Sequence, residues 1–155
     1  MRGPPRASHA CCTPPHTSPC PPFFLPGQIF ILRGSAAVSR LRRRDTYGFF
    51  HEPVDLAAFP HYLQVCATPM DTGTILARVA AGEYTDAAAA AAGVAPSPRV
   101  RSGVYAGAWA LIRRDVALVV SNCCAFNPAE SIFAREAVRL QAAASAAAAP
   151  CLPPC

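Results

Sequence analysis

The residue of greatest chemical interest in this sequence is Asn127, a carboxamide followed by Pro128. A carboxamide both donates and accepts hydrogen bonds, so at a helix end it can bind the carbonyl oxygen of a ligand. Taken alone, Asn before Pro is more typical of an ordinary turn or helix cap. Asn122 and Asp115 stand five and twelve residues before it.

Residues 45–70 form a predicted long loop that carries many apolar side chains. Pro53, Pro60 and Pro69 each remove a backbone donor and disfavour helix in the preceding residue. A connection of this length inside a compact domain is uncommon unless it has a function. Because it is apolar, we expect the loop to pack against other parts of the domain. Its larger apolar residues are Phe49, Phe50, Val54, Leu56, Phe59, Tyr62, Leu63 and Val65. Individually, such aromatic residues are more typical of a core than of a pocket.

The cysteine and histidine residues predict neither a metal site nor an enzyme. The eight Cys include no C-x-x-C pair and no matching His pair. Cys66 and Cys123 lie in apolar patterns, where a free Cys behaves as a small buried hydrophobe. Cys123 and Cys124 fall on a predicted helix without a neighbouring His, so neither has the base that a nucleophile requires. We expect no catalytic residue, no metal and no cofactor.

Length and charge restrict the class of protein. A chain of 155 residues is enough for one domain with tails. The formal charge is +5 and all 14 basic residues are Arg. The absence of Lys suggests the base composition of the coding sequence and not selection for a function. The run Arg40, Arg42, Arg43 and Arg44 is more typical of a solvated helix face than of a phosphate site, so direct nucleic-acid contact is not expected.

No segment predicts a membrane protein. Residues 23–32 are apolar but interrupted by Pro26 and Gly27, and they are too short to span a bilayer. Residues 1–44 contain Arg and Ser and no acidic residue, so a transit peptide stays open as an alternative. We expect residues 1–27 to be a disordered tail rich in Pro and Cys.

Four helices are predicted around the long loop. The first covers residues 28–44, is weakened by Gly34 and is strongest from Ser35. The second starts after Pro69 with Asp71 or Thr72 as its cap and ends near Gly82.

The third and fourth helices follow a segment of low complexity. Residues 85–103 are predicted to be an insertion, although their Ala run can be helical locally. From Ala106 the third helix shares one apolar face, which consists of Trp109, Ile112, Val116, Val119 and Cys123. Asn127-Pro128 ends it, Ser131 caps the fourth helix, and Pro150 stops that helix before a tail at 150–155.

Two motifs in this arrangement resemble the bromodomain. The first reads Phe50-x-x-Pro53-Val54-Asp55, then Pro60-x-Tyr62, then Pro69-Met70-Asp71-x-Gly73-Thr74-Ile75. The second reads Asp115-Val116-x-Leu118-x-x-x-Asn122-Cys123-x-x-Phe126-Asn127-Pro128-x-x-Ser131. Thr72 departs from the pattern, which usually has an apolar residue there, and Gly48-Phe49 stand where many members have Trp-Pro. The resemblance implies an all-α, left-handed up-down four-helix bundle over residues 28–149.

A further resemblance concerns the type of bromodomain. Tyr105-x-x-x-Trp109-Ala110-Leu111-x-x-x-Asp115-Val116 with Phe126-Asn127 looks like the second bromodomain of WD-repeat bromodomain proteins. On that reading the chain is a fragment of a larger protein or the product of a truncated gene model.

The resemblance also implies the roles of the pocket residues. Asn127 would donate to the acetyl oxygen of acetyl-lysine, and Tyr62 would reach the same oxygen through an ordered water. Phe126 would lie behind Asn127, and Phe133 would narrow the pocket as its gatekeeper. The wall of the pocket would consist of Val54, Pro53, Phe50 and Phe59.

The implied function is that of an acetyl-lysine reader with no catalysis. Its partners would be acetylated histone tails or other acetylated nuclear proteins, in chromatin or transcription regulation. We expect a nuclear monomer with no small-molecule substrate and no membrane contact. The alternative is a degenerate bromodomain that acts as an interaction scaffold without binding acetyl-lysine.

Overall fold

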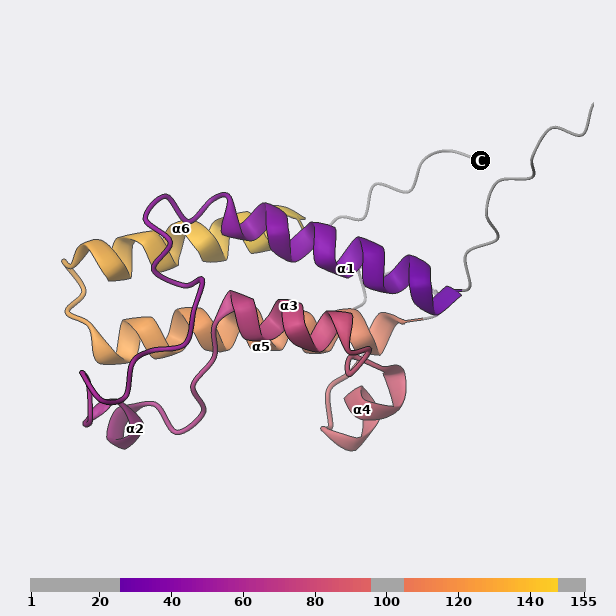
Figure 1. Cartoon of the computed structure of the whole chain (residues 1–155), viewed down its shortest axis with the longest axis horizontal. Coiled ribbons are helices and arrows are strands. Elements are labelled where there is room, and N and C mark those ends of the chain that lie inside the picture. The colour runs from indigo at the N-terminus through magenta and orange to yellow at the C-terminus, as the bar shows by residue number, and fades with distance from the viewer. Residues whose placement is uncertain (1–25, 96–104, 148–155) are drawn as a thin grey trace, which may run out of the picture.

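Two pairs of long helices form the body of the protein in a computed structural model that describes residues 26–95 and 105–147. α1 (Pro26–Arg42) lies beside α6 (Ile132–Ala147), and α3 (Thr72–Ala80) lies along α5 (Ala106–Phe126) (Figure 1). The short helix α2 (Tyr62–Val65) packs near the C-terminal end of α5, whereas α4 (Asp86–Ala91) packs near its N-terminal end (Figure 1). All regular secondary structure in these residues is helical, which confirms the predicted all-α bundle.

The core lies between the long helices and follows their apolar periodicity. On α5 the predicted face is confirmed: Ile112, Val116, Val119 and Cys123 are buried and Trp109 packs against them. Each large aliphatic side chain buried in this way stabilises the fold by roughly 1.5–3 kcal/mol. The facing core residues include Phe30, Val38, Leu41, Ile75, Val79 and Leu140. None of the helices in the described residues is long and apolar enough to cross a membrane.

α1 begins at Pro26, two residues before the predicted start, and ends at Arg42, two residues before the predicted end. The ring of Phe30 is buried and lies 4.9 Å from the ring of Tyr105 and 5.5 Å from that of Trp109. A Cβ at Gly34 would lie 3.0 Å from Val79 Cγ1. Gly34 therefore lowers helix propensity at this position but allows α1 to approach α3 closely.

The predicted caps of the second and fourth helices and the predicted end of the second helix are confirmed. The Asp71 side chain accepts a hydrogen bond from Thr74 N at 2.8 Å, and Ser131 Oγ accepts one from Ala134 N at 3.1 Å. Gly82 follows α3 with φ +70°, which suits a residue without a Cβ. The predicted stop at Pro150 and the two tails lie outside the described residues, apart from Pro26 and Gly27, which begin α1.

The first half of the predicted insertion is part of the packed structure. Asp86 accepts hydrogen bonds from the backbone N–H groups of Tyr105, Gly107 and Ala108 at 2.9, 2.8 and 3.0 Å. One carboxylate on α4 thus satisfies three donors at the start of α5. A Cβ at Gly107 would lie 2.8 Å from Ala89 Cβ, so small residues let the two helices meet. The remaining residues of the insertion, 96–103, lie outside the described part.

Candidate functional site

Asn127 lies where α5 ends and its side chain turns back onto that helix. Its backbone is extended, with φ −107° and ψ 147°, because Pro128 disfavours helix before it. Asn127 Nδ2 donates to Cys123 O at 2.9 Å and approaches Cys123 Sγ at 3.5 Å. A carboxamide carries two N–H donors, and a thiol sulfur is a weak acceptor. Asn127 is therefore held in one orientation and keeps a donor for a stronger acceptor.

Three aromatic rings gather at Phe126, the residue before Asn127. The Tyr62 ring lies 5.0 Å from the Phe126 ring, and the Phe59 ring lies 6.1 Å from Phe126, both edge to face. Tyr62 is only 5% exposed, whereas Phe59 is 50% exposed. Burial, with Cys66 adding to it, raises the pKa of Tyr62 to about 12, so the phenol keeps its proton at neutral pH. The group presents apolar surface and one neutral hydroxyl.

The loop residues next to Tyr62 are tied to α5 by two hydrogen bonds. Asn122 Nδ2 donates to Thr68 O at 2.7 Å. Cys66 Sγ donates in the opposite direction, to Asn122 O at 3.4 Å. Asn122 belongs to the motif that predicts the site, and in the structure it positions the loop.

The start of the long loop is held by a buried carboxylate and by α3. Asp45 accepts hydrogen bonds from Phe49 N at 3.2 Å and from Phe50 N at 2.8 Å. Phe50 O accepts from Thr72 N at 2.8 Å and from Thr72 Oγ1 at 2.6 Å. Thr72 is fully buried, and its hydroxyl donates a hydrogen bond to Phe50 O. A buried hydroxyl with a partner is tolerated, which explains why Thr can stand at a usually apolar position.

The remaining expected pocket residues differ in burial. Phe50 is buried, Val54 is half-buried and Pro53 is exposed. Phe133 is 41% exposed, and its ring lies 4.5 Å from the ring of Phe49. From the sequence, Phe49 is one of the large apolar residues of the long loop and a departure from the pattern it resembles, and it is not among the predicted pocket residues. Its aromatic type, at a position usually held by Pro, was the one signal that could have linked it to Phe133.

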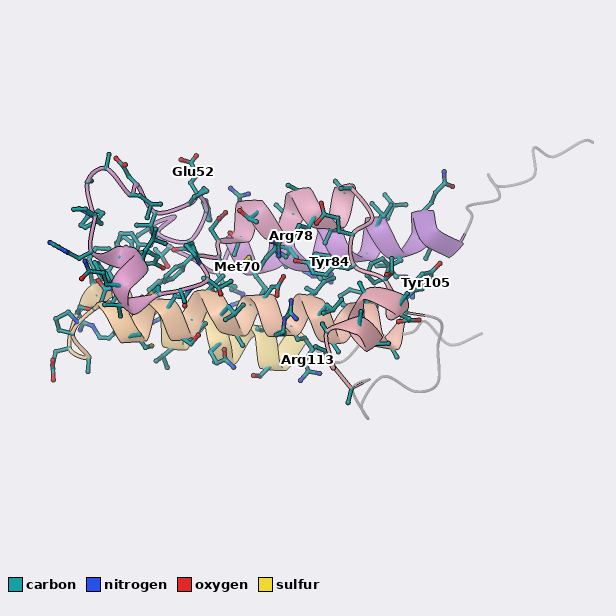
Figure 2. All side chains as sticks on the ribbon, turned by 90° about the horizontal axis from the view of Figure 1, so that it is seen from below. Glu52, Met70, Arg78, Tyr84, Tyr105 and Arg113 are labelled. Atoms are coloured by element: carbon teal, nitrogen blue, oxygen red, sulfur yellow. The ribbon has the colours of Figure 1, made fainter. Side chains whose placement is uncertain are left out.

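The loops at this end of the bundle expose acidic side chains. Glu52, Asp55 and Glu130 are all exposed, and Glu52 projects from the long loop (Figure 2). Asp55 also accepts a hydrogen bond from Ala57 N at 2.9 Å within its own turn. The surface around the aromatic group therefore favours positively charged peptide.

The thiol under Asn127 does not suit nucleophilic chemistry. Cys123 is buried, and burial raises the pKa of its thiol to about 11, with smaller contributions from Cys124 and Cys66. A nucleophilic Cys needs a lowered pKa. In the described residues, no group of His, Cys, Asp and Glu side chains could hold a metal ion.

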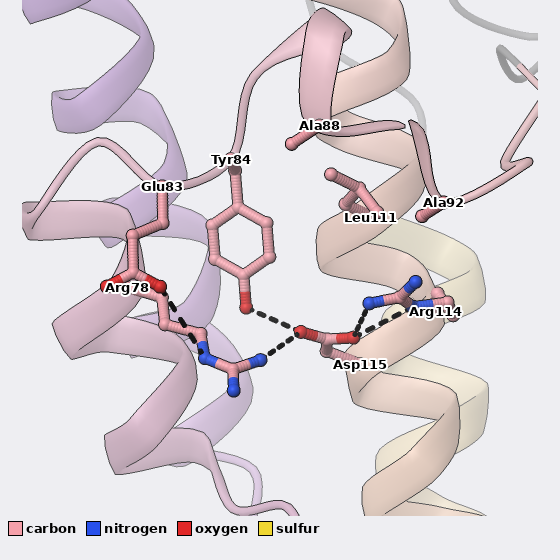
Figure 3. A pocket seen from close by; sticks show the side chains of 8 residues that line it. All are labelled: Arg78, Glu83, Tyr84, Ala88, Ala92, Leu111, Arg114 and Asp115. Carbon is pink, nitrogen blue, oxygen red and sulfur yellow. Dashed lines mark hydrogen bonds and ion pairs between the residues drawn. The ribbon is translucent and has the colours of Figure 1, made fainter. Parts of the chain in front are cut away.

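A hollow of about 140 Å³ lies elsewhere, between α3, α4 and α5 (Figure 3). Beside it, fully buried Asp115 accepts hydrogen bonds from Tyr84 Oη at 2.9 Å and from Arg78 at 3.1 Å. Arg114 Nη2 lies 3.0 Å from the other carboxylate oxygen. Burial and then the charge of Asp115 raise the pKa of Tyr84 above its ordinary value. These groups satisfy one another, so the hollow is structural and Asn127 marks the better candidate site.

Comparisons with known sequences give one consistent result. A family model described as "Bromodomain" matches residues 35–139. The "Bromodomain-containing protein homolog" of Drosophila melanogaster is 27% identical over 101 residues, which are 65% of this chain and 6% of that protein. The human "Bromodomain and PHD finger-containing protein 3" is 28% identical over 101 residues, which are 65% of this chain and 7% of that protein. The chain thus spans a small fraction of the length of these relatives.

Solved structures share the fold. Trypanosoma cruzi bromodomain BDF2 has a TM-score of 0.58 and 22% identity, over 76% of this chain and 85% of that one. A Leishmania donovani bromodomain complexed with bromosporine has a TM-score of 0.56 and 26% identity, over 76% and 81% of the two chains. The second bromodomain of Candida albicans Bdf1, bound to an imidazopyridine, has a TM-score of 0.56 and 26% identity, over 77% and 96%. The WD-repeat type stays a prediction.

Proposed function

Because the chain belongs to the bromodomain family, whose members are binding modules, we propose that it reads acetylated lysine and that Asn127 recognises the acetyl group. The observation that carries the proposal is the orientation of the Asn127 side chain. Its Nδ2 is held at 2.9 Å from Cys123 O, which leaves a second N–H for the acetyl oxygen. Burying that oxygen without a partner would cost on the order of 1–3 kcal/mol, so one well-placed donor decides binding.

Tyr62 would complete the contact through a water molecule. Its raised pKa of about 12 keeps the phenol neutral, so it can donate to a bridging water at physiological pH. Acetylation removes the charge of lysine and leaves an aliphatic stem with a neutral amide. Phe126 and Phe59 would contact that stem together with the loop residues Val54, Pro53 and Phe50. Phe133 would restrict the width of the pocket.

The acidic loops support a histone tail or another basic acetylated segment as the partner. Glu52, Asp55 and Glu130 would attract the Lys and Arg residues that flank the acetylated position. The area that one acetyl-lysine buries is small, so dissociation constants from micromolar to millimolar are expected, roughly −8 to −4 kcal/mol. We place the protein in the nucleus, as a monomeric reader in chromatin or transcription regulation.

The test is calorimetric titration of the full chain with acetylated and unmodified histone peptides. We expect binding of at least one acetylated peptide, none of its unmodified counterpart, and loss of binding in Asn127→Ala. Gln141→Ala, which shortens an exposed carboxamide on α6, is the matched control and should bind as the wild type does. Bromosporine, found on the Leishmania relative, provides a second probe for the same pocket.

The alternative is a scaffold in which the pocket is degenerate. Absence of binding across an acetyl-peptide panel, or equal binding by wild type and Asn127→Ala, would establish that alternative. We also propose that the domain is not an enzyme. Deacetylation of a bound peptide by the purified chain would overturn that statement.

A further inference from the structure

Three aromatic rings form a row that joins the start of the long loop to the start of α6. The ring of Phe49 lies 5.0 Å from that of Tyr47, at an interplanar angle of 16°, and 4.5 Å from that of Phe133, at 47°. We call Tyr47, Phe49 and Phe133 the aromatic row. Its outer members are 55% and 41% exposed, whereas the middle ring is half-buried. Contacts between rings, more than burial, therefore hold the row together.

The middle ring of the row is fixed by its own backbone and by the core. Phe49 N donates to Oδ1 of buried Asp45 at 3.2 Å. The Phe49 ring also meets the buried ring of Phe50 edge to face, with the centroids 6.5 Å apart. Between Tyr47 and Phe49, Gly48 adopts φ +72°, a turn that glycine makes without strain and that accompanies the stacking of the two rings. Phe49 is thus a fixed surface for its neighbours.

Phe133, by contrast, depends on the row for its position. It follows Ile132, the first residue of α6, and its side chain is 41% exposed. Exposed side chains change rotamer on a timescale of picoseconds to nanoseconds. Within the described residues, the Phe133 ring packs against one other ring, that of Phe49. An aromatic pair of this kind favours the packed arrangement by roughly two- to twelvefold.

We propose that Phe49 and Tyr47 are positioning residues that hold the Phe133 ring in one rotamer and thereby make the pocket select acetyl-lysine against lysines with longer acyl groups. The selectivity rests on the proposed function, in which Phe133 restricts the width of the pocket. A ligand that needs the ring displaced must also break its contact with Phe49, whereas a ligand that fits beside the packed ring does not. The contact therefore lowers the affinity for the larger ligand alone.

The two positioning residues differ in how directly they act. Phe49 touches Phe133, whereas Tyr47 stacks on the opposite neighbour in the row and reaches Phe133 only through Phe49. Phe49 also stands at a position usually held by Pro, which has no ring to offer. The selection is therefore a property of the residues of this chain, and it should be graded from Phe49 to Tyr47.

The test is calorimetric titration of the full chain with one histone peptide that carries either acetyl-lysine or butyryl-lysine. We expect the wild type to prefer the acetyl form. Phe49→Ala should raise the affinity for the butyryl form by roughly two- to twelvefold and leave acetyl affinity almost unchanged. Tyr47→Ala should raise it less, and Phe49→Tyr, which retains the ring, should behave as the wild type does. The control is Leu32→Ala, which shortens an apolar side chain on α1 that is as exposed as Tyr47, at 55%.

A double-mutant cycle separates positioning from a general loosening of the loop. Phe133→Ala should itself raise the butyryl affinity, and adding Phe49→Ala should bring no further rise, because Phe49 acts only through Phe133. Retained acetyl binding shows that each variant is folded. An unchanged ratio of acetyl to butyryl affinity in Phe49→Ala overturns the inference. A full further rise in the double variant overturns it as well, because Phe49 would then act independently of Phe133.

Side-chain NMR couplings of Phe133 test the positioning without any ligand. We expect the values of a single rotamer in the wild type and in Phe49→Tyr, and averaged values in Phe49→Ala. Averaged couplings in the wild type overturn the inference whatever the peptides do. A wild type that binds no acylated peptide overturns the proposed function and the selectivity with it, while the couplings still decide whether Phe49 positions Phe133.

Discussion

The two ends of α5 use polar groups in opposite ways. Toward its N-terminal end, Asp86 and buried Asp115 accept hydrogen bonds from donors of α3, of α5 and of the turn between α3 and α4. At its C-terminal end, Asn127 bonds to its own helix and retains a donor, and the preceding residue, Phe126, packs against the buried ring of Tyr62. Polar groups that are saturated from within hold elements together, whereas a positioned but incompletely used donor is available to a ligand.

Removing the buried carboxylate should have the largest effect on stability. Asp115→Ala leaves Tyr84 Oη buried without a partner and removes the charge that Arg78 and Arg114 share. Both guanidinium groups are partly exposed and would be hydrated in the variant, which limits the cost of losing their partner. We therefore expect the free energy of unfolding to fall by about 3 kcal/mol, the lower end for a broken buried pair. Urea denaturation measures it, with Asp55→Ala as an exposed control. The folded fraction should still bind acetylated peptide, and loss of peptide affinity would contradict the division between the two ends.

A smaller loss is expected when α4 no longer caps α5. Asp86→Ala removes the acceptor of three backbone donors, for which we expect a cost of about 1–2 kcal/mol. Asp86→Asn keeps one side-chain oxygen and should be less damaging. Thermal denaturation of the two variants gives the order. Equal melting temperatures for wild type and Asp86→Ala would mean that α4 contributes nothing to α5.

These expectations also indicate how far sequence predicts the fold. The helices are predictable because their apolar periodicity and their caps, Asp71 and Ser131, are local signals. The packing of α4 was not predictable, because an Ala-rich segment carries no amphipathic pattern. Its position depends on Asp86 reaching backbone donors some twenty residues away in the chain. Gly34 likewise weakens a helix locally and is accounted for only by Val79 on another helix.

In the candidate site, too, local features were predictable from the sequence, whereas contacts between distant residues were not. The spacing from Asp115 to Asn127 predicts the residue that ends α5, and the structure packs the ring of Tyr62 against that of Phe126, the residue before it. The contact between Phe49 and Phe133 was not predicted, because the two residues are distant in sequence and Phe49 replaces a residue without an aromatic ring. The hydrogen bond from Thr72 to Phe50 O was not predicted for the same reason. Only the folded chain shows which backbone carbonyl lies next to the Thr72 hydroxyl.

At the C-terminal end of α5, Tyr62→Phe should affect binding and spare the fold. The substitution removes the hydroxyl that would hold the bridging water but keeps the ring against Phe126 at 5.0 Å. We expect acetyl-peptide affinity to fall by about 0.5–1.5 kcal/mol, with an unchanged melting temperature within a few degrees. Calorimetric titration measures the affinity. Unchanged affinity would remove Tyr62 from the pocket and leave Asn127 as the only polar contact.

The smallest effect concerns Cys123, which touches Asn127 without binding the ligand. Folding raises the pKa of its thiol from 9.0 to about 11, so between these values the unfolded chain binds fewer protons than the native one. Stability should therefore be complete below about pH 9 and should fall as the pH rises toward 11. The raised pKa values of Tyr62 and Tyr84 also make the protein less stable as the pH rises, but only above the ordinary tyrosine pKa of 10.0. Cys123→Ala should remove the early part of the decline, whereas exposed Cys124→Ala should keep it. Melting temperatures from pH 7 to 10 measure the slope, and identical slopes in both variants would show that the thiol next to Asn127 does not titrate with unfolding.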